Sequence, residues 1–228
     1  MPGHRSVPVA VVPVAVVFAG GMPVAPLLRD RLPEGACVIA ADSGLSVAAA
    51  LGLHVDLLVG DLDSADPAAV EAAAASGTVV ERHPAAKDAT DLELAFDAAR
   101  AKGVRRIVVV DGGGDRVDHL LGNVQLYAAP ALAGVEVEAF TGTAHLAVAR
   151  GGEPPVPIAG PPGSLVTLLA AGGPARGIVT EGLRYPLSDE SLDPGTTRGV
   201  SNELVGGSGS VRLASGTLLV VQPFGGVQ

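Results

Sequence analysis

The sequence has few aromatic residues and little positive charge. Only 3% of its 228 residues are aromatic and tryptophan is absent, so a hydrophobic core must be built mainly from valine, leucine and alanine. Lys and Arg together number 15 against 24 Asp and Glu residues, which gives a formal net charge of −9. Nucleic-acid binders usually carry a basic patch, so we expect no nucleic-acid partner. A nucleotide is still possible, because a bound cation can reverse the local field.

The sequence also lacks paired cysteines and long apolar runs. Cys37 is the only cysteine, which excludes an internal disulfide and is typical of a reducing compartment, so we expect a cytoplasmic protein. No run approaches the about 18 apolar residues of a membrane span, so no membrane contact is expected. The apolar run at residues 7–19 resembles a secretory signal. Pro8 and Pro13 interrupt it, and residues 14–19 fit a buried strand better; a secreted binding protein is the alternative if the run is a signal.

Apolar runs and helical segments alternate through the first 150 residues. Strands are predicted at residues 14–19, 36–41, 55–59, 78–81, 106–110 and 135–140. Helices are predicted at residues 25–32, 45–51, 67–75, 91–102 and 117–128, the last with an apolar stripe of Val117, Leu120, Leu121, Val124 and Tyr127. This alternation predicts βαβ units in a parallel sheet, and the uninterrupted apolar strands are typical of a sheet with helices on both faces.

The composition changes after residue 150. Residues 151–163 are rich in proline and glycine and read as a linker. Beyond it, short Val/Leu/Thr runs separated by glycine turns predict a small all-β domain at residues 164–228. We therefore expect an α/β domain at residues 1–150 followed by a linker and a β-domain.

Acidic and glycine-rich segments follow the predicted strands. They are Gly20-Gly21, Asp42-Ser43-Gly44, Asp61 with Asp63, and residues 111–116. In open α/β sheets the ligand site lies beyond the carboxyl ends of the strands. The sequence therefore predicts a site at this edge of the sheet.

Asp61 and Asp63 are the first candidates for that site. In an extended segment residues i and i+2 point to the same side, so the two carboxylates would repel each other unless a hard cation lay between them. Mg²⁺ typically uses one or two carboxylates together with substrate phosphates. The alternative is a solvated turn that only caps the next helix, since Asp66-Pro67 reads as a helix start.

A second group of charged residues follows at residues 87–93. Asp88 and Asp91 could join Asp61 and Asp63 in one carboxylate cluster, and Lys87 and Arg116 could neutralise phosphate charge. Each feature has a simpler interpretation. Asp91 could merely favour a helix N-terminus, His119 could be a surface residue, and the glycines at 112–114 could form a flexible turn rather than a phosphate-binding loop.

Together these motifs resemble, in order and spacing, those of the thiamine pyrophosphokinase (thiamine diphosphokinase) family. The resemblance covers about residues 14–221. The motifs are Asp42-Ser43-Gly44, Gly60-Asp61-Leu62-Asp63-Ser64, Lys87-Asp88-Ala89-Thr90-Asp91-Leu92-Glu93, Gly114-Asp115-Arg116-Val117-Asp118-His119-Leu120-Leu121-Gly122-Asn123, Thr180-Glu181-Gly182-Leu183-Arg184-Tyr185-Pro186-Leu187 and Ser201-Asn202-Glu203.

The resemblance implies an N-terminal Rossmann-like nucleotide-binding domain, a C-terminal β-sandwich that binds thiamine, and a homodimer with active sites between subunits. It implies Mg²⁺-dependent transfer of a pyrophosphoryl group from ATP to the thiamine hydroxyl, giving thiamine diphosphate and AMP. The implied residues are Asp61, Asp63 and Asp91 for catalysis and Mg²⁺, Asp42, Lys87, Asp88, Arg116, Asp118, His119 and Asn123 for ATP, and Ser201 and Asn202 for thiamine.

Two departures from the family pattern affect single positions. The family usually has Gly-Gly-Arg where this chain has Gly114-Asp115-Arg116, which brings an extra carboxylate near the phosphates, and Asp-Gly-Gly where this chain has Asp42-Ser43-Gly44. Some relatives stack thiamine on a tryptophan, so here the thiazolium must be held by acids or by another apolar surface. The alternatives are a pyrophosphokinase of the same fold for another alcohol, such as a hydroxymethyl pterin, and a non-catalytic nucleotide or thiamine sensor.

Overall fold

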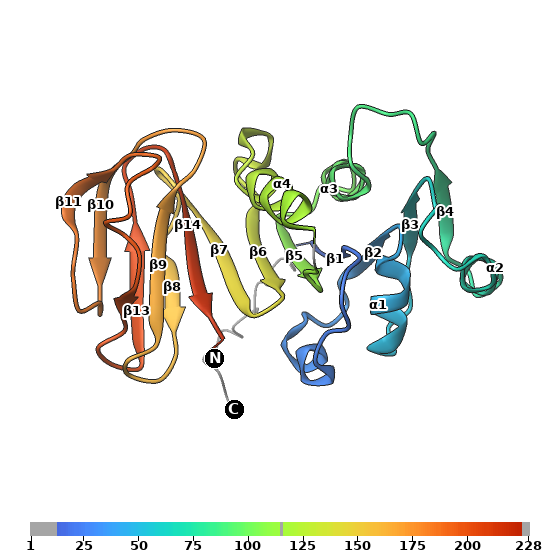
Figure 1. Cartoon of the computed structure of the whole chain (residues 1–228), viewed down its shortest axis with the longest axis horizontal. Coiled ribbons are helices and arrows are strands. Elements are labelled where there is room, and N and C mark those ends of the chain that lie inside the picture. Colours follow the sequence, from blue (N-terminus) through green and yellow to red (C-terminus); the bar gives the residue numbers. More distant parts are fainter. Residues whose placement is uncertain (1–12, 115, 225–228) are drawn as a thin grey trace, which may run out of the picture.

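The computed structural model describes residues 13–114 and 116–224, so residues 7–12 of the apolar N-terminal run and Asp115 lie outside the described residues. The described residues form a ten-stranded sheet with the order β12-β9-β14-β7-β6-β5-β1-β2-β3-β4 and a four-stranded sheet with the order β11-β10-β13-β8. Figure 1 shows the second sheet stacked against one end of the first. No described helix has both the length and the apolar character needed to span a membrane.

Six parallel strands form the other end of the large sheet. They are β1 (Val14–Phe18), β2 (Cys37–Ala41), β3 (Leu57–Gly60), β4 (Val79–Arg82), β5 (Arg106–Asp111) and β6 (Glu136–Thr141). Each begins and ends within two residues of its predicted limits. The chain runs outward from β1 to β4 and then returns to place β5 on the other side of β1. This reversal makes the gap between β1 and β5 the switch point at which such sheets bind ligands.

Helices cover both faces of the parallel strands, as predicted. The helices α1 (Gly44–Ala50) and α2 (Pro67–Ala75) contribute to the core on one face. The helices α3 (Asp91–Ala101) and α4 (Val117–Tyr127) contribute to the core on the other. The segment at residues 25–32 forms a 3₁₀ helix, η1 (Pro26–Arg31), rather than an α-helix, since prolines bracket a stretch too short for an α-helix.

The remaining strands form an antiparallel β-sandwich, which confirms the predicted fold class. The large sheet continues through β7 (Ala144–Arg150), β14 (Thr217–Pro223), β9 (Leu165–Ala170) and β12 (Asn202–Glu203). The second sheet consists of β8 (Val156–Ala159), β10 (Ala175–Glu181), β11 (Ser188–Leu192) and β13 (Ser208–Arg212). A separate core of Val, Leu, Ile and Ala side chains fills the space between the two sheets. Strand β8 lies inside the segment expected as linker, where it pairs with β13.

The apolar stripe predicted for α4 is only partly buried. Tyr127 is fully buried, but Val117 and Leu121 are 62% and 60% exposed and Leu120 is 38% exposed. Val124 and Tyr127 pack in or against the core, whereas Val117 and Leu121 on the first turns remain largely exposed among the described residues. The sequence pattern therefore identified a core-facing stripe only for the second half of the helix and an exposed apolar surface for the first half.

Candidate active site

A cleft of about 550 Å³ opens at the carboxyl ends of the parallel strands. The loops after β1, β2 and β5 form its walls, together with the first residues of α3 and the cleft-facing side of α4. The cleft-lining residues with polar side chains are Asp42, Ser43, Ser64, Lys87, Thr90, Asp91, Asp111, Arg116, His119 and Asn123. The cleft lies where the switch-point rule and the acidic strand ends predicted it.

Two glycine loops meet at the switch point. A Cβ atom on Gly112 would lie 1.9 Å from the carbonyl oxygen of Met22, and one on Gly21 would lie 2.2 Å from that of Gly113. The N–H of Met22 donates to the carbonyl oxygen of Gly113 over 3.2 Å. Only glycine allows this backbone contact, which holds the two loops together along the floor of the cleft.

Three carboxylates from three elements gather beside these loops. Asp42 follows β2, Asp61 follows β3, and Asp91 is the first residue of α3. One oxygen from each lies within 4.8 Å of the others. Gly60 makes the approach possible, since a Cβ there would lie 2.9 Å from Oδ1 of Asp91. The helix start therefore places Asp91 in the cleft as well as favouring the N-terminus of α3.

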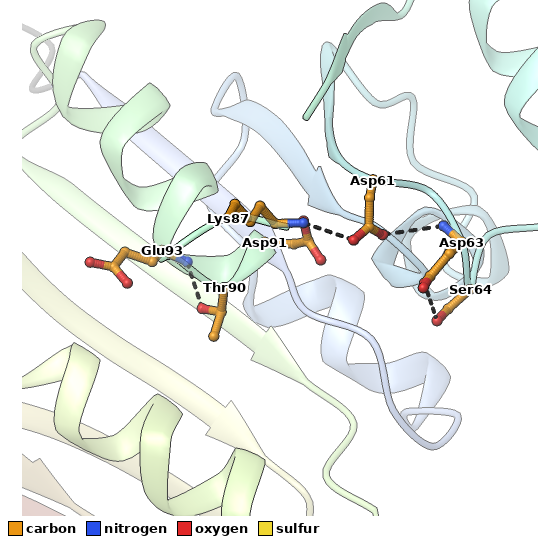
Figure 2. A network of polar contacts seen from close by, with 7 residues as sticks. All are labelled: Asp61, Asp63, Ser64, Lys87, Thr90, Asp91 and Glu93. Atoms are coloured by element: carbon orange, nitrogen blue, oxygen red, sulfur yellow. Dashed lines mark hydrogen bonds and ion pairs between the residues drawn. The ribbon is translucent and has the colours of Figure 1, made fainter. Parts of the chain in front are cut away.

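Lys87 links two carboxylates of this cluster. Its Nζ lies 2.8 Å from Oδ2 of Asp61 and 3.0 Å from Oδ1 of Asp91 (Figure 2). The hydrogen bond to Lys87 lowers the pKa of Asp61, and the same bond raises the pKa of Lys87. The ion pair is lost at acidic pH, when Asp61 becomes protonated, and at alkaline pH, when Lys87 loses its proton. The pair is therefore charged at neutral pH.

Asp63 was predicted to join the cluster, but it lies outside it. Leu62 has a φ of +61°, so the segment is not extended and the i, i+2 argument for Asp61 and Asp63 does not apply. The backbone N–H of Asp63 donates to Oδ1 of Asp61 over 3.3 Å, and its carboxylate accepts a bond from the Ser64 hydroxyl over 2.9 Å (Figure 2). Asp42 occupies the third position instead. Asp88 is exposed and does not line the cleft.

The donor set fits a hard divalent cation. Oδ1 of Asp42 is buried and makes no hydrogen bond within the described residues, whereas the buried Oδ1 of Asp91 has the Lys87 ammonium 3.0 Å away. Burial raises the pKa of Asp42 above its usual value, which is the effect of taking an uncompensated carboxylate out of water. A buried carboxylate oxygen without a hydrogen bond is rare unless an ion or water binds it, and Mg²⁺ prefers oxygen ligands.

The start of α4 brings further polar groups to the cleft. Arg116, His119 and Asn123 line it, whereas Asp118 does not. The Nε of Arg116 donates to Oδ1 of Asp118 over 2.9 Å, and its terminal nitrogen to Oδ2 over 2.6 Å. This bidentate pair lowers the pKa of Asp118 well below its usual range. Asp118 thereby holds the guanidinium that was predicted to meet ATP.

Ser201 and Asn202 lie at the other end of the large sheet, at β12. Both polar ends of the Asn202 amide bond the backbone of Tyr185, with Oδ1 accepting over 3.0 Å and Nδ2 donating over 2.7 Å. Ser201 is exposed, has a φ of +59° and donates its N–H to the Thr167 hydroxyl. The structure does not bring these two residues into the cleft of the same chain.

Sequence reasoning did not name four polar residues that line the cleft as site residues: Ser43, Ser64, Thr90 and Asp111. The first three were noted only as members of motifs, and Asp111 only as the start of an acidic and glycine-rich segment after a strand. A signal for Asp111 was present, since it ends an apolar strand immediately before three glycines.

Two family models match the chain in this order. The catalytic domain of thiamin pyrophosphokinase matches residues 29–138, and the vitamin B1 binding domain of thiamin pyrophosphokinase matches residues 158–218. The first match contains the cleft carboxylates, and the second contains most of the sandwich.

Individual relatives agree with both family models. The thiamine pyrophosphokinase of Bacillus subtilis is 25% identical over 207 residues, covering 91% of this chain and 96% of the relative. The crystal structure of thiamine pyrophosphokinase from Bacillus subtilis has a TM-score of 0.80 at 24% identity, covering 93% of this chain and 99% of that one. That of Geobacillus thermodenitrificans has a TM-score of 0.76 at 26% identity, covering 94% and 98%. The chain belongs to the thiamine pyrophosphokinase family.

Proposed function

We propose that this chain is a thiamine diphosphokinase, which transfers the pyrophosphoryl group of ATP to the hydroxyl of thiamine and releases AMP. The observation that carries the proposal is the cluster of Asp42, Asp61 and Asp91 with Lys87 beside a glycine-lined cleft at the switch point of the sheet. Phosphoryl-type transfer depends mainly on positioning and charge neutralisation, and this cleft offers both.

The carboxylates would hold Mg²⁺. Asp42, Asp61 and Asp91 fit this role by their spacing and by the buried, unpartnered Oδ1 of Asp42, with Asp63 next to Asp61 along the chain. When bound, the cation would neutralise phosphate charge and draw electrons from the phosphorus that is attacked. The carboxylates themselves would fix its position from the ends of two strands and the start of α3.

The basic side chains would bind the phosphates. Lys87 is held by two carboxylates at the edge of the cleft, from which its ammonium group can turn to a phosphate. Arg116 uses two N–H groups for Asp118 and keeps others on its guanidinium, so it can bind a phosphate while Asp118 holds its orientation. The thiamine hydroxyl would attack the β-phosphorus in line, and Asp63, which is exposed beside the cluster, or Asp91 would accept its proton.

We propose that the active form is a homodimer in the cytoplasm. Strand β12, which carries Asn202 directly after Ser201, is five strand positions from β5, or roughly 24 Å at the usual strand spacing. The cleft and the expected thiamine residues of one chain are thus too far apart to share a substrate. The exposed apolar side chains on α4, next to the cleft, favour a second copy as the source of the missing half-site. The lone cysteine supports a reducing compartment.

The reaction is tested by measuring AMP formation from ATP and Mg²⁺ with and without thiamine. We expect thiamine-dependent AMP with thiamine diphosphate as coproduct. ADP would indicate a simple kinase. If folded protein gives no thiamine-dependent product, a substrate panel decides. AMP formed with another acceptor, such as a hydroxymethyl pterin, would identify that acceptor as the substrate. Nucleotide binding without turnover would indicate a sensor.

Two carboxylate variants test the assignment of roles. Asp61→Asn removes a cluster oxygen and the partner of Lys87, so we expect kcat to fall by about three orders of magnitude. Asp63→Asn is expected to abolish turnover while leaving the fold and ATP binding intact, because Asp63 lies outside the cluster. Circular dichroism controls for folding. A near-normal kcat for Asp63→Asn would contradict its role as proton acceptor.

A further inference from the structure

A buried carboxylate without an assigned role lies at the end of β5. Asp111 is 5% exposed, and its backbone is paired with Thr141 of β6. It lies in the wall between the nucleotide cleft and a smaller, mainly apolar groove of about 260 Å³. Burying a carboxylate is costly unless its oxygens are hydrogen-bonded, so its partners indicate what it does.

Three donors from two elements converge on Asp111. The backbone N–H of Gly113 donates to its Oδ1 over 2.9 Å. The Nδ2 of Asn123 and the hydroxyl of Tyr127 donate to its Oδ2 over 3.0 and 3.2 Å. Asn123 and Tyr127 are four residues apart, so they share one face of α4. The carboxylate therefore ties the glycine loop at residues 112–114 to the helix that follows it.

Only a carboxylate satisfies this arrangement. It accepts at both oxygens and donates nothing, whereas an amide would turn an NH₂ group toward at least one of the three donors. The same argument fixes the orientation of the Asn123 side-chain amide, since only its NH₂ group can donate to a carboxylate. Its carbonyl oxygen and one N–H then remain for a ligand, in an orientation set by Asp111.

We infer that Asp111 is a positioning residue for the nucleotide, acting through the Gly113 loop and Asn123 without touching the substrate. The inference rests on the proposed function. Gly113 is also tied to the loop after β1 through the bond from Met22 to its carbonyl oxygen. Asp111 is thus the link that holds both glycine loops and the second half of α4 in one arrangement around the site expected for the phosphates.

The test is binding of the non-hydrolysable ATP analogue AMPPNP with Mg²⁺, measured by calorimetry, together with steady-state kinetics. For Asp111→Asn we expect the Kd of the analogue and the KM for ATP to rise about tenfold, because one tether of the loop or of Asn123 is lost. The KM for thiamine should not change. Tyr127→Phe removes one donor but keeps the ring against Phe96, so we expect a rise of about two- to threefold.

Thr78→Val is the matched control. Thr78 is 6% exposed and its hydroxyl donates to the carbonyl oxygen of Val55 over 2.7 Å, outside the cleft and away from the partners of Asp111. Its replacement should lower Tm without changing the Kd of the analogue. If it weakens the analogue as much as Asp111→Asn does, the effect is loss of stability and the inference is wrong.

The remaining outcomes separate this inference from the proposed function. Failure of the wild-type protein to bind the analogue would refute the nucleotide site itself. Binding that is unchanged in folded Asp111→Asn would overturn the positioning role alone. If Asp111→Asn does not fold, Tyr127→Phe decides, and an unchanged Kd in that variant would overturn the role.

Discussion

At the scale of single residues, Lys87 occupies the position that a metal ion needs. Its ammonium lies between Asp61 and Asp91 and relieves their mutual repulsion. In Lys87→Met the carboxylates lose this cation, so we expect the nucleotide-free protein to bind Mn²⁺ about tenfold more tightly and the KM for ATP to rise about tenfold. Electron paramagnetic resonance measures free Mn²⁺ in the first case, and kinetics give the second.

Lys102→Met is the control for this experiment. It removes an exposed lysine at the C-terminal end of α3, outside the cleft, so neither quantity should change. If Lys87→Met weakened Mn²⁺ binding instead, Lys87 would be supporting the carboxylates rather than competing for them.

Gly60 shows how one residue without a side chain makes room for the cluster. Its φ is +147°, and a Cβ would lie 2.9 Å from Oδ1 of Asp91. Gly60→Ala is expected to lower the free energy of unfolding by about 1–3 kcal/mol and to reduce kcat strongly, because Asp91 must move. Gly77→Ala carries a similar backbone strain at φ +104° with no atom within 4 Å, so urea unfolding should detect a loss while kcat stays normal. Equal kcat in both variants would contradict the spatial argument.

The residue scale is also where prediction from sequence was least complete. Asp61, Asp91 and Lys87 were predicted because each lies in a motif with a local signature. The cluster contains Asp42 and not the predicted Asp63. This is because Leu62 has a left-handed backbone conformation and because β2 pairs in parallel with β3. Neither backbone handedness at a leucine nor strand order can be read from spacing along the chain.

At the scale of elements, the N-cap of α3 is both a stabilising and a functional feature. The Thr90 hydroxyl accepts from the N–H of Glu93 over 3.2 Å, and Asp91 follows it directly. Thr90→Ala should cost about 1 kcal/mol in urea unfolding and raise the KM for ATP, since the start of α3 frays. Asp66→Ala removes the equivalent cap of α2, which lies outside the cleft, and should cost similar stability with an unchanged KM. A KM rise in both variants would mean that general destabilisation is responsible.

Element boundaries were predictable where local chemistry sets them. Asp66-Pro67 and Thr90 mark helix starts, and the apolar runs between glycine turns mark strands, so these elements lie where the sequence placed them. Helix α4 differs, because its apolar pattern indicates only that these side chains avoid water. Whether Val117 and Leu121 meet a core or another surface depends on what packs on the helix.

At the scale of the whole molecule, the large sheet runs from the nucleotide cleft to the sandwich as one continuous structure. Figure 1 shows the sandwich strands and the helices α1 and α2 at opposite ends of the molecule. A rigid sheet cannot bend far enough to bring β12 to β5, so under the proposed function the cleft and the expected thiamine residues of one chain would be two half-sites completed by another chain. A two-fold dimer would pair each cleft with the sandwich of the partner chain.

This arrangement makes a prediction that a single-chain site does not. Asp61→Asn disables the cleft, and Ser201→Arg places a cation where the cationic thiazolium is expected. Each variant alone should be inactive. When the two variants are refolded together, half of the dimers are mixed. In each mixed dimer, one of the two sites combines a cleft with an intact Asp61 and a sandwich with an intact Ser201. About a quarter of wild-type activity should therefore return. If cleft and sandwich of the same chain formed the site, every site would carry one defect and mixing would restore nothing.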